Sequence, residues 1–106
     1  MYLLIIVVVN IDYKEEVVLA LQGAGIDKAT YVNGFNLDKE LNEEFPLFTG
    51  FFRSKEDREK ESMIIFSYVE EKEAAEEFIE NLKAAGIDTK DPEILRTYLF
   101  EVDKLT

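Results

Sequence analysis

The chain lacks two residue types that carry much of the chemistry in enzymes. It has neither His nor Cys, so the commonest acid–base group, the commonest metal ligand and the thiolate nucleophile are missing. Catalysis would rest on carboxylates, Lys or Tyr. Adjacent carboxylates such as Glu15–Glu16, Glu43–Glu44 and Glu76–Glu77 fall on expected helix surfaces or loops, where solvated faces are the ordinary explanation. We therefore expect no catalytic residues, no metal site and no enzymatic activity.

One short turn offers a place for a phosphate. The chain contains neither the P-loop pattern nor GxGxxG, which leaves Gly34–Phe35, at the exit of an expected strand, as the candidate turn. Taken in isolation, the glycine is more ordinarily explained by a bulge or by the end of a strand.

A dense apolar cluster interrupts a charged stretch in the middle of the chain. Residues 38–44 are acidic, residues 55–61 alternate in sign, and FPLFTGFFR lies between them. Aromatic residues and Arg are enriched in the buried centres of protein interfaces. The predicted partner-binding residues are Phe45, Phe48, Phe51, Phe52 and Arg53. The alternative is that the cluster folds back onto its own sheet or onto a neighbouring subunit.

Two strand–helix–strand units can position these residues. The first begins with YLLIIVVV over Tyr2–Val9, whose continuous apolar character indicates a strand covered on both faces. Asp12 and Glu15 resemble a capping box, which predicts a helix over Tyr13–Ala24. A second strand is expected over Ala29–Phe35.

The second unit repeats this order. It has an apolar strand over Met63–Val69, an amphipathic helix over Glu70–Ala85 and a last strand over Leu95–Val102. The tetrapeptide Ala-Gly-Ile-Asp ends both expected helices, at residues 24–27 and 85–88. An internal repeat is the simplest account.

This order predicts an α+β protein with a ferredoxin-like βαββαβ sandwich, in which two helices cover one face of a four-stranded antiparallel sheet. We expect one domain over residues 1–106, with a long loop at residues 36–62. Because the first strand is apolar on both sides, the open sheet face is expected to pack against other copies of the chain.

Composition restricts the partners and the compartment. The 23 acidic residues against 12 basic ones give a formal charge of −11, which repels a nucleic-acid backbone. The longest apolar run, Leu3–Val9, is too short for a membrane span and lacks the flanks of a secretory signal. With no Cys and no export signal, we expect a cytoplasmic protein.

The layout resembles the PII signalling family. The resemblance rests on the order of elements, the chain length and the long loop after the second strand. It also rests on the junction Asn33-Gly34-Phe35-Asn36, which is similar to that family's Lys-Gly-Phe-Gly junction. It implies a homotrimer, an effector loop (the T-loop) and nucleotide clefts between subunits. Asn33, Gly34, Phe35 and Asn36 are then the candidate ligand-binding residues, and an adenine nucleotide is the candidate ligand. The segment 84–92, AAGIDTKDP, is short and acidic where the family has a Gly-rich basic loop, so the usual mode of ATP binding is not expected.

The resulting hypothesis is a PII-like regulatory module that senses a small ligand and binds a partner protein through the loop. A CutA-like trimeric ion-tolerance or binding protein shares the fold, although its corresponding loop is usually shorter. A small ferredoxin-like enzyme is the third alternative, since this fold hosts many unrelated activities.

Overall fold

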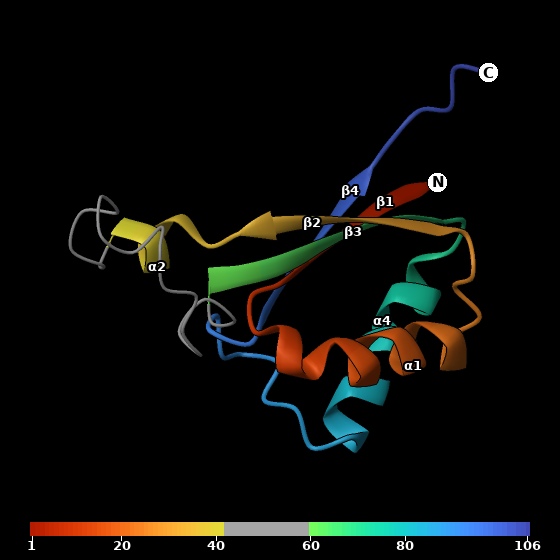
Figure 1. The fold of residues 1–106 in the computed structure, drawn as a ribbon. Coiled ribbons are helices and arrows are strands. Elements are labelled where there is room, and N and C mark those ends of the chain that lie inside the picture. The colour runs from red at the N-terminus through yellow and green to blue at the C-terminus, as the bar shows by residue number, and fades with distance from the viewer. Residues whose placement is uncertain (42–59) are drawn as a thin grey trace.

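The computed structural model describes residues 1–41 and 60–106, with the elements drawn in Figure 1. Their order is β1 (Tyr2–Val8), a 3-10 turn η1 (Ile11–Tyr13), α1 (Lys14–Gly23), β2 (Ala29–Phe35), α2 (Leu37–Leu41), β3 (Glu61–Val69), α4 (Lys72–Ala84) and β4 (Leu95–Glu101). The short helix α2, at the start of the long connection, was not expected from the sequence. The predicted partner-binding residues Phe45, Phe48, Phe51, Phe52 and Arg53 lie outside the described residues.

All four strands form one antiparallel sheet in the order β2-β3-β1-β4. The central strand β1 pairs with β3 from Tyr2↔Val69 to Val8↔Met63, and with β4 on its other side. Helices α1 and α4 lie on the same face of the sheet (Figure 1). The fold is therefore the expected ferredoxin-like α+β sandwich.

The core fills the space between this sheet face and the two helices. Leu4, Ile6 and Val8 of β1 alternate toward the helices and are at most 2% exposed, as the two-residue period of a strand requires. Helix α4 contributes Phe78 and Leu82, both fully buried, from an apolar stripe at helical spacing.

The 3-10 turn η1, which leads into α1, begins with a side-chain cap. The side chain of Asn10 accepts a hydrogen bond from the Asp12 backbone N–H at 3.0 Å, which satisfies a donor that a helix start leaves open. Helix α1 itself starts after Tyr13, which forms no side-chain cap, so the cap lies at Asn10 of η1 and not at the predicted Asp12. Val17, Ala20 and Leu21 then turn toward the core.

Both helices end in the same way, as the repeated tetrapeptide suggests. Gly25 has φ of 73° and Gly86 has φ of 84°, a backbone region that glycine enters without steric cost. The Ile26 N–H donates to the Leu21 carbonyl at 2.9 Å, and the Ile87 N–H donates to the Leu82 carbonyl at 3.1 Å. These bonds close the helix ends in the pattern of a Schellman motif.

The other face of the sheet is apolar and uncovered in the single chain. Leu3, Ile5 and Val7 of β1 point to this face and are half-buried by their neighbours. Its exposed large apolar side chains are Val32, Phe66, Tyr68, Tyr98 and Phe100. The first strand is therefore apolar on both faces, as predicted. Within the described residues, no helix has the length and apolar character needed to cross a bilayer.

Candidate functional site

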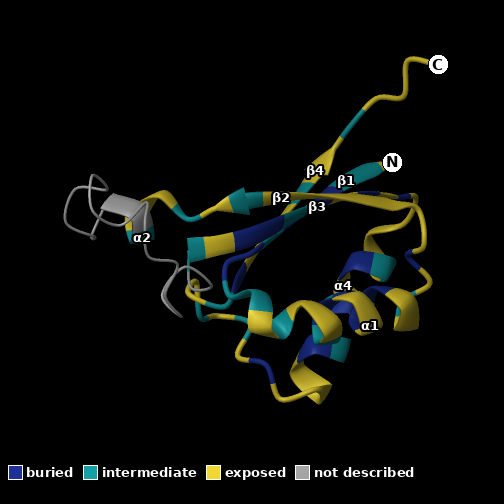
Figure 2. Cartoon of the chain, in the orientation of Figure 1, coloured by how far each residue is buried: buried dark blue, intermediate teal, exposed yellow. Residues whose placement is uncertain are grey.

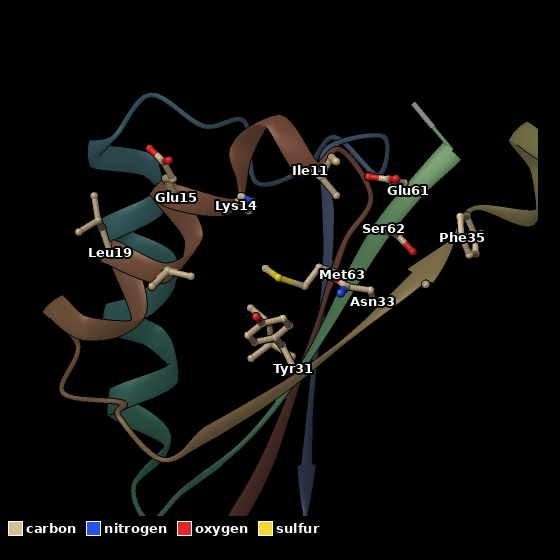
Figure 3. A pocket seen from close by; sticks show the side chains of 13 residues that line it. Ile11, Lys14, Glu15, Leu19, Tyr31, Asn33, Phe35, Glu61, Ser62 and Met63 are labelled. Carbon is tan, nitrogen blue, oxygen red and sulfur yellow. The ribbon is translucent and has the colours of Figure 1, made fainter. Parts of the chain in front are cut away.

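A groove lies between helix α1 and the edge strand β2. Its volume is about 690 Å³, within the range that small-molecule sites occupy. Side chains from η1, α1, β2 and the start of β3 line it (Figure 3). We call this space the α1–β2 groove.

The groove is open because no helix covers β2. Strand β2 is the edge of the sheet, and six of its seven residues are exposed (Figure 2). Tyr31 and Asn33 pair with Ile65 and Met63 of β3, so they share the sheet face that carries the core. The Tyr31 side chain remains 62% exposed there, which leaves room beside α1.

The floor and the helix wall of the groove are apolar. Met63 and Ile65 form the floor and are 6% and 3% exposed. Val18 and Leu19 of α1 form the opposing wall, and they are 42% and 65% exposed. Exposed apolar side chains gathered beside a cavity are typical of binding surfaces.

The groove lining contains a few polar side chains, contributed by β2, α1 and the start of β3. The side chain of Asn33 reaches into the groove beside Met63, and the Tyr31 hydroxyl points toward α1 (Figure 3). Charged residues in the described lining are Lys14, Glu15 and Glu61. Within residues 1–39 and 60–106, no cluster of three acidic side chains has the arrangement to hold a metal ion.

Three of the four ligand-binding residues predicted from the sequence line this groove. They are Asn33, Gly34 and Phe35. Gly34 pairs with Ser62, and a Cβ atom there would lie 3.2 Å from the Ser62 hydroxyl and from the Ile64 Cδ1. This close approach explains the glycine without a bulge.

Asn36, the fourth predicted residue, is not part of the groove lining. Its side-chain amide donates to the Val9 carbonyl at 2.9 Å and to the Glu61 carbonyl at 3.5 Å. Its backbone N–H donates to the Lys60 carbonyl at 2.6 Å. Asn36 therefore joins the end of β2 to the start of β3 and to the end of β1.

The long connection leaves and re-enters the sheet at this same end. Phe35 and Glu61 form the last residue pair of β2 and β3, and both line the groove. Beyond Phe35, Lys39 of α2 forms an ion pair of 3.3 Å with Glu93 in the segment before β4. A molecule in the groove would thus contact both residues that flank the connection.

The sequence did not identify Val18, Leu19 or Tyr31 as candidate site residues, although all three line the groove. A signal for Leu19 was present in the internal repeat: sliding the chain by the offset between the two Ala-Gly-Ile-Asp segments aligns Leu19 with Glu80. An apolar residue at a position that is charged in the other half indicates a surface with a different use.

A second hollow, of about 810 Å³, lies at the opposite end of the sheet. Its lining includes Met1 and the chain end at residues 102–106, where Leu105 is 94% exposed. The last residues extend away from the sheet (Figure 1). Because this tail supplies much of its wall, we regard the α1–β2 groove as the better-formed site.

Comparisons with known proteins bear on the fold. No family model matches the sequence, and no curated protein matches it significantly. Among solved structures, a protein of Thermus thermophilus, provisionally described as a PII-like signaling protein, superposes with a TM-score of 0.56 at 14% sequence identity, over 93% of this chain and 83% of that one. At this identity the likeness concerns the arrangement of the backbone. The chain therefore shares its fold with a PII-like protein.

Proposed function

We propose that this chain is a PII-like regulatory module of the cytoplasm and not an enzyme. In this proposal the α1–β2 groove senses a small ligand, and residues 36–62 bind a partner protein. The observation that carries the proposal is the position of the groove. It borders Phe35 and Glu61, the residues at which the long connection leaves and re-enters the sheet.

The coupling between ligand and connection has a physical basis in the strand ends. Asn36 hydrogen-bonds to Lys60 across the base of the connection, next to the Phe35–Glu61 pair. A ligand that shifts Phe35 or Glu61 also shifts this hydrogen-bonded base. The affinity of a partner for the connection can then depend on the ligand, as linkage between two sites requires.

A ligand screen tests the sensing step. The panel contains an adenine nucleotide, the uncharged nucleoside adenosine, bicarbonate and small carboxylates. A compound that binds the folded state raises the melting temperature. Tyr31→Ala should remove that rise, whereas Leu105→Ala, which truncates a side chain that is 94% exposed outside the groove and the open sheet face, should keep it. Equal loss in both variants would contradict binding in the groove.

The open sheet face supports a homotrimer. An uncovered apolar face carrying Ile5, Phe66, Tyr98 and Phe100 is the kind of surface that normally marks a protein–protein interface. Light scattering should give about three times the chain mass of 12.3 kDa. Ile5→Glu places a charge in this face and should lower the measured mass. A wild-type monomer or dimer would refute the trimer.

Partner binding through the connection is tested by its aromatic cluster. Changing Phe48, Phe51 and Phe52 together to Ser should leave the melting temperature nearly unchanged and should abolish capture of a partner, identified by mass spectrometry against the wild-type chain. If the cluster instead folds back onto the protein, the triple change should lower stability by several kcal/mol, as truncation of buried aromatics does.

A further inference from the structure

We infer that the α1–β2 groove selects an uncharged, flat heterocyclic ring and disfavours phosphate esters of the same ring. This inference deepens the proposed sensing function, because it names the ligand class of that site. It rests on three properties of the described lining: the shape of the apolar walls, the chemistry of the polar groups and the balance of charge.

The apolar walls fit a flat ring system. Tyr31 lines the groove from β2, Val18 and Leu19 line it from α1, and Met63 and Ile65 of β3 line it between them. Aromatic and branched aliphatic side chains contact the faces of a ring over a large area. An aliphatic chain would bury less of the exposed Tyr31 ring than a flat ring would.

The polar groups in the groove fit a ring with nitrogen or oxygen atoms at its edge. The Asn33 amide offers both a donor and an acceptor, and the Tyr31 hydroxyl does the same. Among the described residues, the Asn33 side chain has no hydrogen-bond partner, so it is available to a ligand. An amide reads a heterocycle edge that presents a donor next to an acceptor.

The charges disfavour an anion. The described lining contains two acidic residues, Glu15 and Glu61, and one basic residue, Lys14. The whole chain carries a formal charge of −11, so its long-range field also opposes the approach of an anion. A phosphate ester would therefore lose electrostatic free energy relative to the uncharged ring.

Two features of the groove act in the opposite direction. Lys14 is one, and the start of α1 is the other, since a helix N-terminus attracts negative charge. The first turn of α1, however, already carries Glu15 and Glu16. These side chains occupy the favourable field of the helix start themselves.

A charge series on one ring provides the test. Adenosine, AMP, ADP and ATP share a heterocycle and differ in negative charge, and guanosine, cytidine and uridine widen the set of uncharged rings. Binding to the full chain is followed by NMR shifts of the Tyr31, Asn33 and Met63 signals at low salt. We expect an uncharged compound to bind best, with affinity falling about two- to threefold for each added negative charge.

Removing the carboxylates should weaken this discrimination. The double variant Glu15→Gln with Glu61→Gln keeps side-chain size and should flatten the charge series, so that the phosphorylated compounds gain relative to adenosine. The matched control is Glu76→Gln with Glu77→Gln on α4, which changes the net charge equally but outside the groove. The control should keep most of the original discrimination.

The outcomes separate this inference from the proposed function. Groove signals that respond more strongly to ATP than to adenosine would overturn the ligand class while supporting a sensing groove. Equal effects of the two double variants would overturn the role of Glu15 and Glu61. A groove that responds to no member of the panel would contradict both the inference and the sensing function.

Discussion

The two βαβ halves of the chain end their helices identically and then diverge. In each half a glycine of positive φ and the following isoleucine N–H close the helix end. After that point they differ in burial, because the helix-facing residues of β4 are mostly buried or half-buried, whereas those of β2 are exposed. The α1–β2 groove lies in the first half, where the two halves of the internal repeat differ.

The second half has additional chain before its last strand. Residues 89–94 separate the helix exit from β4, and they are shaped by hydrogen bonds from the Lys90 N–H to the Asp88 carboxylate and from the Glu93 N–H to the Asp91 carboxylate. The Ile94 carbonyl then accepts from the Val9 N–H at 2.9 Å and the Asn10 N–H at 3.1 Å. This segment ties the start of β4 to the end of β1.

The first half has no such segment. Only Lys28 stands between the Ala-Gly-Ile-Asp exit and β2. Strand β2 follows the helix exit directly, and the helix beside it carries Leu19 where α4 carries Glu80. The groove thus lies beside the strand of the half that lacks the additional segment.

The largest expected effect belongs to the core that both halves share. Ile6 is fully buried in the central strand and pairs with Ile65 on one side and Thr97 on the other. Ile6→Asp should lower the free energy of unfolding by more than about 4 kcal/mol, since it buries an unpaired carboxylate. Urea unfolding measures the loss. Ala29→Asp, at the exposed start of the edge strand β2 and on the face away from the open sheet face, is the control and should cost far less.

The next effect compares an aromatic residue from each half. Phe78→Ala removes a fully buried ring from α4 and should cost about 3–5 kcal/mol. Tyr31→Ala removes a ring that is 62% exposed in the open groove and should cost less than about 1 kcal/mol. Thermal unfolding of both variants checks the difference. Similar losses would mean that the groove is filled in solution.

An intermediate effect tests the part of the repeat that is shared by the two halves. Gly25→Ala and Gly86→Ala each force a side chain into a left-handed conformation, with no neighbouring atom within 4 Å of the added Cβ. Each should cost about 1 kcal/mol, because only the backbone conformation is penalised. A large inequality between the two losses would show that the helix exits are not equivalent.

Most of the fold could be predicted from local sequence patterns. The apolar strand at β1, the stripe on α4 and the two glycine exits are fixed by periodicity and by φ preference, so the sequence located them to within a few residues. The α+β class then followed from the order of elements. Helix α2 escaped prediction because its five residues are too few to show a helical period.

The groove was only partly visible in the sequence. Gly34 marked the junction, and the structure places it with Asn33 and Phe35 in the lining. Asn36 looked equivalent in sequence, but its amide turns to the Val9 carbonyl instead. Tyr31 and Leu19 could not be assigned because exposure of an edge strand depends on what other segments cover it, which is a tertiary property.

The smallest expected change in stability gives the sharpest test of the comparison. Leu19→Glu gives α1 the residue that stands at the equivalent position of α4, and the Leu19 side chain is 65% exposed. The free energy of unfolding should therefore change by no more than about 0.5 kcal/mol, while binding of any ligand in the groove should weaken at least tenfold. The reciprocal Glu80→Leu, which gives up only the exposed contact with Lys83 at 3.4 Å, should also be nearly neutral and should leave the groove unaffected. If Leu19→Glu instead unfolds the protein substantially, Leu19 is buried in solution by another surface, and the difference between the halves would lie in what covers them and not in an open site.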